Sequence, residues 1–387
     1  MRPWIILSAL ALARIAFGYQ FQSVASMGPD LIALFGLSYS AFGSLIGAFM
    51  LAGVFVALPL GALGRRFGDR WVLSGGLALM TIGALVSGFG GGPAGIAAGR
   101  TLSGVGAVAM IVLQGKIIAD FFTGKQFMLA IAISVCTYPI GVGMAQLILP
   151  PILHGFGWQA GFLSAGVMSA MALVLFLASY RPTAHAAAVP RGFAWPSRRE
   201  CILLTIAGLI WTAYTGCYAG YTAYIPATMS VRGDSLALIG LVMTIGTWGN
   251  VPATIYGGDL AARFGGLNIL LLGTAALTAG IVGTALTGWP ILWAVVLGVI
   301  GAVHPGVIMA VGTLSARPEN RAVGMGIFYT VYYIGGTIGP LTCGWAADLY
   351  GGPAGGLLMS AVLGLLVIPL FLWHRSMAHH ETMLVRP

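Results

Sequence analysis

Twelve apolar segments, each long enough to cross a lipid bilayer, follow one another along this chain of 387 residues. A helix that crosses the hydrocarbon core needs about 20 mainly apolar residues. Charged residues make up only 7% of the chain, whereas a soluble domain carries about 25%. We therefore predict an all-α polytopic membrane protein with helices at about 4–27, 38–60, 71–90, 93–119, 127–149, 158–180, 201–225, 236–257, 267–287, 290–314, 322–344 and 354–373.

The longest polar stretch, residues 181–200, divides the segments into two groups of six, and turn signals such as Pro150-Pro151 separate the others. This predicts an N-terminal six-helix bundle over 1–180, a central loop over 181–200 and a C-terminal six-helix bundle over 201–387.

The distribution of Lys and Arg predicts the orientation in the membrane. Apart from Arg232 and three cations inside the segments, every Lys and Arg lies on the side of the N-terminus. Such an excess marks the cytoplasmic side, so we expect both termini and the central loop in the cytoplasm. The absence of an Asn-x-Ser/Thr sequon is compatible with a bacterial inner membrane.

A short signature occurs twice, 197 positions apart: GALGRRFG begins at Gly61 and GDLAARFG at Gly258. At the same offset Gly76 aligns with Gly273. A duplicated half in so apolar a chain predicts two parallel six-helix repeats.

Twelve segments in two sixes, with a glycine-rich basic loop after the second segment of each, resemble the major facilitator superfamily over essentially the whole chain. Its loop motif, roughly G-x-L-a-D-r-x-G, is matched by Gly61, Leu63, Arg66 and Gly68 and by Gly258, Leu260, Arg263 and Gly265. Arg65 and Ala262 occupy the acidic position, with Asp69 and Asp259 nearby. Arg100, Ser103 and Gly104 resemble the fourth-helix motif of the family, and Gly339-Pro340 lies in a hinge-like motif of the eleventh segment.

The resemblance implies a monomeric transporter, not an enzyme, that needs no cofactor or metal and holds its substrate between two halves that rock in the lipid bilayer. It also implies conformational roles for the loop and hinge residues Gly61, Arg65, Arg66, Gly68, Asp69, Gly258, Asp259, Arg263, Gly339 and Pro340.

Three cations lie inside the segments: Arg14, Arg100 and Lys116. A cation at a helix centre costs about 2.5–3.5 kcal/mol on insertion scales, so each needs a reason. Arg14 and Arg100 either contact substrate or bond to neighbouring helices. Lys116, near a segment end, is expected to extend towards the interface.

No Asp or Glu lies in the middle of a segment. Arg without a facing carboxylate attracts anions and can grip a carboxylate through two parallel hydrogen bonds. We therefore predict a small anionic substrate, an organic acid or an inorganic oxyanion, recognised by Arg14 and Arg100.

Several polar and aromatic side chains inside the segments are further candidates for substrate contact. Those of the N-terminal half are Gln22 and Gln114, and those of the C-terminal half are Tyr214, Tyr218, Tyr329 and His304. Packing between helices is the alternative role of the tyrosines. Asn250 precedes Val251-Pro252, where a broken helix would expose carbonyl groups.

His304, directly before Pro305, is the central titratable candidate for coupling to protons. A packing histidine beside a proline kink is the alternative. Exchange for a counter-anion or facilitated flux needs no such group and is the favoured expectation.

Other functions remain open on the same fold. An exporter of hydrophobic or cationic drugs fits the aromatic residues, but the missing mid-segment carboxylate argues against cations. An enzyme is disfavoured because no G-x-S-x-G, H-E-x-x-H or Walker loop occurs. The scattered basic residues do not indicate nucleic-acid binding. Within anion carriers, Gln22-Ser23 and Met27-Gly28-Pro29 loosely resemble the cyanate/nitroimidazole branch, and oxalate/formate and monocarboxylate carriers are alternatives.

Overall fold

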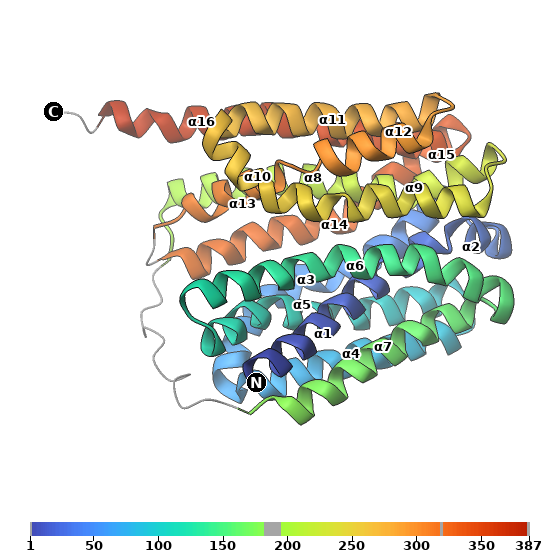
Figure 1. Ribbon diagram of the computed structural model, residues 1–387, viewed down its shortest axis with the longest axis horizontal. Helices are drawn as coiled ribbons and strands as arrows, with labels where there is room; N and C mark the ends of the chain where they lie inside the picture. The colour runs from blue at the N-terminus through green and yellow to red at the C-terminus, as the bar shows by residue number, and fades with distance from the viewer. Residues whose placement is uncertain (1, 182–194, 318–319, 385–387) are drawn as a thin grey trace. The chain divides into compact units, whose positions relative to one another are not determined.

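The structure is a computed structural model that describes residues 2–181, 195–317 and 320–384. The side chains of residues 2, 58–66, 128, 321–322 and 379–384 lie outside this description. Every regular element in the described ranges is a helix (Figure 1). The chain divides into two compact units, which we call unit 1 (Met1–Pro190) and unit 2 (Arg191–Pro387).

The described residues of unit 1 form six long helices and one short one. They are α1 (Arg2–Ser26), the short α2 (Gly28–Phe35), α3 (Tyr39–Phe67), α4 (Asp69–Phe89), α5 (Pro93–Phe121), α6 (Gly124–Phe156) and α7 (Trp158–Ser179). Each long helix coincides with one predicted segment. The turn predicted at Pro150-Pro151 is wrong, because α6 continues through both prolines for another turn and ends before Gly157. Membrane helices tolerate proline where neighbouring helices satisfy the freed backbone groups.

Unit 2 contains α8 (Arg198–Val231), α11 (Gly266–Leu286) and α14 (Arg321–Tyr350) as continuous long helices. Its other three predicted segments are interrupted. They consist of α9 (Leu236–Trp248) with α10 (Asn250–Phe264), of α12 (Pro290–Val295), the π-helix η2 (Val296–Ile300) and α13 (Pro305–Leu314), and of α15 (Pro353–Leu365) with α16 (Val367–Leu384). The break predicted at Asn250 is therefore present.

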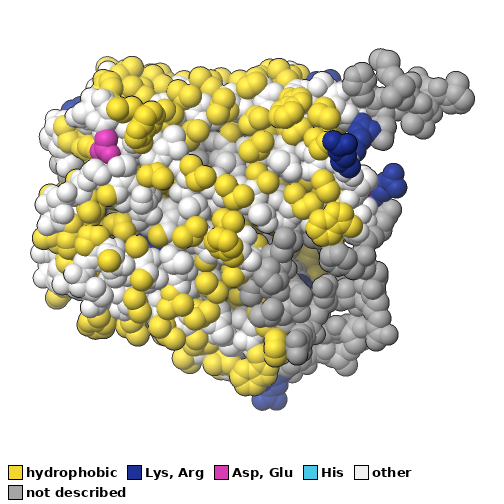
Figure 2. Space-filling view, turned by 180° about the vertical axis from the view of Figure 1, so that it is seen from behind, with side chains coloured by type: hydrophobic (Ala, Val, Ile, Leu, Met, Phe, Trp, Pro, Cys, Tyr) yellow, Lys and Arg dark blue, Asp and Glu magenta, His cyan; other side chains and the backbone are white. Residues whose placement is uncertain are grey.

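Eleven helical segments in the described ranges are long and apolar enough to cross a membrane. The twelfth predicted segment, 322–344, lies within the 30-residue helix α14, which is not among the eleven. Its Gly and Tyr residues make it less apolar than its neighbours. Large hydrophobic side chains such as Phe55 and Phe89 are more than 70% exposed, and Figure 2 shows apolar side chains spread over the visible face with few charges. This is the surface expected of a protein surrounded by lipid.

Glycines at equivalent positions of the two repeats share a positive backbone dihedral angle φ. Gly68 (φ 82°) and Gly265 (φ 87°) each precede the helix that follows the signature loop. Gly36 (φ 58°) and Gly233 (φ 86°), also 197 positions apart, share a positive φ. Because residues with a side chain rarely adopt this region, these glycines preserve equivalent turns in both units.

Glycines also allow close helix contacts within unit 1. A Cβ atom at Gly83 of α4 would strike the backbone of Gly99 and the hydroxyl of Ser103 on α5. A Cβ at Gly141 of α6 would strike the carbonyl oxygen of Ile15 on α1. Small residues at such contacts let membrane helices pack backbone to backbone, and here they bring α4 against α5 and α6 against α1.

Candidate functional site

Arg14 and Gln114 form a polar pair inside unit 1. Arg14 lies near the middle of α1, and its Nη1 donates to Oε1 of Gln114 on α5 at 3.0 Å. Gln114 is 1% exposed, and its Nε2 lies 3.5 Å from the carbonyl oxygen of Leu10. Arg14 itself is only half-buried. The pair therefore fixes one part of a guanidinium that still has an accessible surface.

Arg100 is held in a different way. Its side chain is 1% exposed, and all five N–H groups donate to protein acceptors. On α3 the acceptors are the carbonyl oxygens of Leu45 (2.6 Å) and Ile46 (3.2 Å). On α1 they are the carbonyl oxygens of Gln20 (3.2 Å) and Phe21 (3.1 Å) and the hydroxyl of Ser23 (3.3 Å). Of its two predicted roles, this geometry supports the structural one, since no N–H remains for a ligand in this conformation.

Gln22, also on α1, is 1% exposed. It lies about two turns along the helix from Arg14, since 3.6 residues make a turn. Its neighbour Gln20 donates to the carbonyl oxygen of Met80 at 2.9 Å and to the hydroxyl of Ser103 at 3.0 Å. The buried glutamines at this end of α1 thus belong to the packed interior of unit 1.

The sequence predicts that Lys116 extends towards the interface, but in the structure Lys116 forms an ion pair. Its Nζ lies 2.7 Å from Oδ2 of Asp69, in the first turn of α4. The Lys116 side chain is 33% exposed and the Asp69 side chain 4%. A buried carboxylate needs such a partner, so this ion pair ties the start of α4 to the end of α5.

The predicted conformational residues are described unevenly. The side chains of Gly61, Arg65 and Arg66 lie outside the described part of the chain, while Asp259 and Arg263 are exposed on α10. In unit 2 the hinge-like motif lies inside α14, which contains Pro340 and continues through it. Pro340 has no N–H to donate along the helix, and its carbonyl oxygen accepts a 3.2 Å bond from the hydroxyl of Tyr224 on α8.

A buried polar cluster lies in unit 2 where two segments are interrupted. The ring of His304 contacts that of Tyr214 edge-on, with centroids 5.0 Å apart, and the phenol of Tyr214 hydrogen-bonds to Asn250. The hydroxyl of Thr254 donates to Oδ1 of Asn250 at 2.7 Å and lies 3.4 Å from the carbonyl oxygen of Ala302. We call Tyr214, Asn250, Thr254 and His304 the break cluster.

Aromatic side chains continue from this cluster along α8 and α14. Trp211 lies 5.6 Å from the ring of Tyr214 and 6.3 Å from that of Phe328. Tyr329, half-buried on α14, contacts Phe328 at 5.3 Å. Tyr218 is also fixed, by a hydrogen bond to Thr247. The structure therefore brings Tyr214 and His304 together directly, and Tyr329 is connected to them through Phe328 and Trp211.

Two features escaped sequence reasoning. The sequence predicts the break at Asn250, but no local signal predicts the interruption between η2 and α13 or the contact of Thr254 with the carbonyl oxygen of Ala302. Glu200 accepts hydrogen bonds from the backbone N–H groups of Ser197 (2.7 Å) and Arg317 (2.9 Å), closing a capping box with Ser197. The Ser-x-x-Glu pattern that precedes an apolar run was a readable signal for the second feature.

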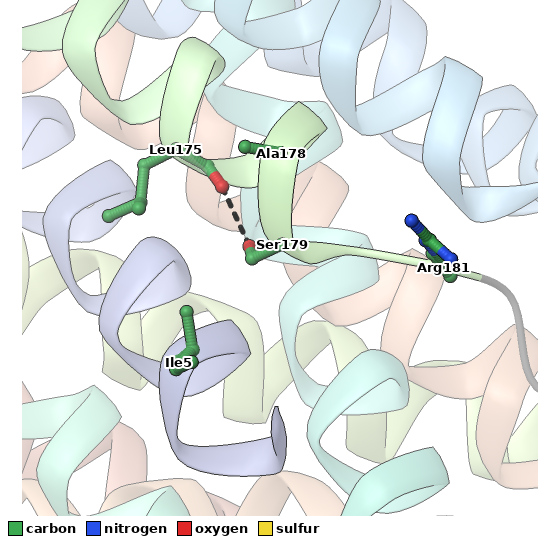
Figure 3. A pocket seen from close by; sticks show the side chains of 5 residues that line it. All are labelled: Ile5, Leu175, Ala178, Ser179 and Arg181. Carbon is green, nitrogen blue, oxygen red and sulfur yellow. Dashed lines mark hydrogen bonds between the residues drawn. The ribbon is translucent and has the colours of Figure 1, made fainter. Parts of the chain in front are cut away.

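In the described ranges no carboxylate lies in the middle of a membrane-spanning segment: their Asp and Glu residues lie in the short α2, in loops, near helix ends or, for Asp259, at an exposed position in the last part of the segment Leu236–Phe264. The described ranges also contain no group of three side chains suited to a metal ion. A pocket of about 410 Å³ lies between α1 and α7 and holds none of the predicted substrate residues (Figure 3). Its lining is Ile5, Leu175, Ala178, Ser179 and Arg181. The polar side chains of the interior are therefore guanidinium, amide and hydroxyl groups in unit 1 and hydroxyl, amide and imidazole groups in unit 2.

Comparison with known proteins finds membrane transporters. The family model described as the Major Facilitator Superfamily matches residues 10–340 and 210–383. The 4-hydroxybenzoate transporter PcaK of Pseudomonas aeruginosa is 23% identical over 381 residues, covering 87% of this chain and 84% of that protein. The gallate transporter of Pseudomonas putida is 24% identical over 165 residues, covering 43% of this chain but only 37% of that protein. A crystal structure of a bacterial homologue of the human lysosomal transporter Spinster has a TM-score of 0.78 at 16% identity and covers 97% of each chain.

Proposed function

Because this chain belongs to the major facilitator superfamily, and is thus a multi-pass membrane transporter, we propose that it carries small organic anions by alternating access. The proposal rests above all on Arg14, a half-buried cation near the middle of α1. An intramembrane cation that is not fully enclosed by the protein marks a ligand pathway by default.

The contact between Arg14 and Gln114 supports a role in binding. The amide oxygen of Gln114 occupies part of the guanidinium and fixes its direction. A guanidinium has five N–H groups, and two parallel ones match the two oxygens of a carboxylate. Gln114 is neutral, so it positions Arg14 without cancelling its charge.

The charge balance of the spans favours anions over cations. In the described part of the chain no carboxylate lies in the middle of a membrane-spanning segment, and a cationic drug would meet no opposite charge there. An exporter of lipophilic cations is therefore the weaker alternative, and the first experiment below separates the two.

Relatives narrow the class of anion. The names of two of them specify gallate and 4-hydroxybenzoate, both aromatic carboxylates. Unit 2 offers matching chemistry, since Tyr214, Tyr218 and Tyr329 combine aromatic faces with hydroxyl groups. We therefore propose Arg14 and Gln114 for the carboxylate, and Tyr214, Tyr218 and Tyr329 stay candidate contacts for an aromatic substrate.

Further proposals concern the surroundings of the protein. The Lys and Arg distribution favours cytoplasmic termini and, with the bacterial relatives, an inner membrane. We propose six-helix bundles over 1–180 and 201–387, joined by a cytoplasmic loop, that act together as a monomer. The loop residues Gly61, Arg65, Arg66 and Gly68 and their counterparts in unit 2 would control the conformational change.

The test is thermal stability of the purified protein against aromatic carboxylates, inorganic oxyanions, lipophilic cations and neutral solutes. A ligand at 100 times its dissociation constant stabilises a protein by about 2.7 kcal/mol. We expect stabilisation by carboxylates in the wild type, its loss in Arg14→Ala, and its retention in Arg181→Ala, a control that removes an exposed arginine. Stabilisation by lipophilic cations alone, unchanged in Arg14→Ala, would refute the proposal.

A further inference from the structure

His304 is completely buried in the interior of unit 2, at the point where one membrane segment is interrupted. The π-helix η2 ends at Ile300, α13 begins at Pro305, and His304 occupies the N-cap position of α13 without a side-chain capping bond. In the described part of the chain its ring nitrogens have no side-chain hydrogen-bond partner, and the backbone of Gly301 is the polar group beside the ring. A buried polar group so poorly satisfied calls for an explanation.

The surroundings of the imidazole contain no charge. On α8 the titratable groups near it are the phenol of Tyr214, in contact with the ring, and the side chains of Cys217 and Tyr218 beside Tyr214. On α11 the facing residue is Gly273, and a Cβ atom there would strike the imidazole. The environment therefore suits the neutral ring and offers no carboxylate to hold an imidazolium in this conformation.

The remaining elements packed around α13 add no charge either. On α10, Asn250 hydrogen-bonds to Tyr214, and the hydroxyl of Thr254 lies 3.4 Å from the carbonyl oxygen of Ala302. From α14, the ring of Phe328 lies against Gly312, eight residues beyond His304. Opening of the break is thus the available way to bring water to the imidazole.

Packing at the break makes His304 sensitive to such an opening. A Cβ at Gly257 of α10 would strike the carbonyl oxygen of Val303, the residue before His304. A Cβ at Gly298 of η2 would lie 2.7 Å from the carbonyl oxygen of Ile245 on α9. The segment of α9 and α10 therefore contacts the backbone of the segment of η2 and α13 on either side of His304. A shift of the first segment moves the backbone that carries His304.

We propose that His304 is the proton-binding site of this transporter, and that it exchanges its proton only when the helix break around it opens to water. The inference rests on the proposed function. The imidazole accepts one proton from water on one side and becomes an imidazolium, and it returns to neutral when that proton leaves to water on the other side. One proton that travels with one monovalent carboxylate makes the cycle electrically neutral.

This role fits the chemistry of the described interior. Imidazole is the side chain whose unperturbed titration lies between pH 5 and 8, and ionisable groups inside membrane spans commonly form proton relays. Arg14 cannot serve, because a guanidinium stays protonated in proteins. Anion recognition in unit 1 and proton binding in unit 2 are thereby assigned to different residues that can be removed separately.

The test uses the full-length protein in liposomes that contain a trapped pH-sensitive dye, with 4-hydroxybenzoate as the probe. Two readouts are taken: exchange of labelled for unlabelled 4-hydroxybenzoate, and the pH change inside when a gradient of 4-hydroxybenzoate is applied. We expect His304→Gln to retain exchange and to lose the pH change. His154→Gln is the matched control, because His154 lies on α6 with its side chain 48% exposed and should leave both readouts unchanged.

If His304→Gln retains exchange, the variant is folded. If this folded variant also retains the pH change of the wild type, the inference is overturned and the proposed function is left intact. Should this variant fail to fold, the wild type decides: exchange without any pH change overturns the inference alone. Absence of both exchange and pH change in the wild type overturns the proposed function and the inference with it.

Discussion

Replacing Arg100 with Met tests the clamp that its guanidinium forms between α1 and α3. Met keeps an unbranched apolar stem but removes the charge and all five N–H donors. In the structure these donors reach acceptors at 2.6–3.3 Å, four of them backbone carbonyl oxygens. Since these carbonyls lie within helices, they keep their helical bonds after the substitution, and the loss is that of the clamp itself.

The expected loss of stability in Arg100→Met is the difference between two opposing free energies. A hydrogen bond from a charged donor contributes about 1.5–3 kcal/mol, so five would total roughly 7–15 kcal/mol if they were additive. Burial of the charge costs several kcal/mol, which the substitution recovers. We expect a net loss on the order of 3 kcal/mol, against about 1 kcal/mol for loss of the 3.0 Å bond to Gln114 in Arg14→Met.

The assay is equilibrium unfolding of the purified protein in detergent, followed by far-ultraviolet circular dichroism. Arg181→Met, at an exposed position, serves as the control and should stay within about 0.5 kcal/mol of the wild type. An Arg100→Met variant as stable as this control would refute the clamp and restore substrate contact as the role of Arg100.

The remaining predictions concern three other contacts. Lys116→Met should destabilise unit 1 by about 1–3 kcal/mol, because it leaves the buried Asp69 carboxylate unpaired; adding Asp69→Asn should recover part of this loss in a double-mutant cycle. Gly273→Ala should cost about 1–3 kcal/mol, since the new methyl group strikes the imidazole; His304→Ser should relieve that cost, and equal costs in both backgrounds would contradict the described contact. Ser197→Ala should lower the stability of unit 2 by about 1 kcal/mol through loss of the capping box, measured by the same unfolding assay, whereas an unchanged midpoint would argue against the cap.

Helix positions could be predicted from the sequence because the length of an apolar run is a local property. All six long helices of unit 1 coincide with predicted segments, and the positive φ at Gly68 and Gly265 follows the repeated signature. Helix continuity was less predictable. Proline pairs signal breaks in water, yet α6 runs through Pro150-Pro151, whereas the π-helix of η2 has no proline and no local signature.

The roles of the buried cations could not be predicted, because they depend on contacts distant in sequence. Lys116 and Asp69 are 47 positions apart, and Arg100 reaches acceptors 54 to 80 positions away. Sequence reasoning identified the right residues as unusual from the cost of burying charge. Only the tertiary packing assigns Arg100 to helix bonding and leaves Arg14 half-buried.

The most direct test of the account is 4-hydroxybenzoate exchange by the protein in liposomes, compared between wild type, Arg14→Lys and Arg14→Ala. The account predicts rapid exchange by the wild type, weaker exchange by Arg14→Lys, because an ammonium group lacks the paired geometry of a guanidinium, and none by Arg14→Ala despite normal folding. Exchange by Arg14→Ala at the wild-type rate and the same half-saturating concentration would contradict the claim that Arg14 recognises the transported anion.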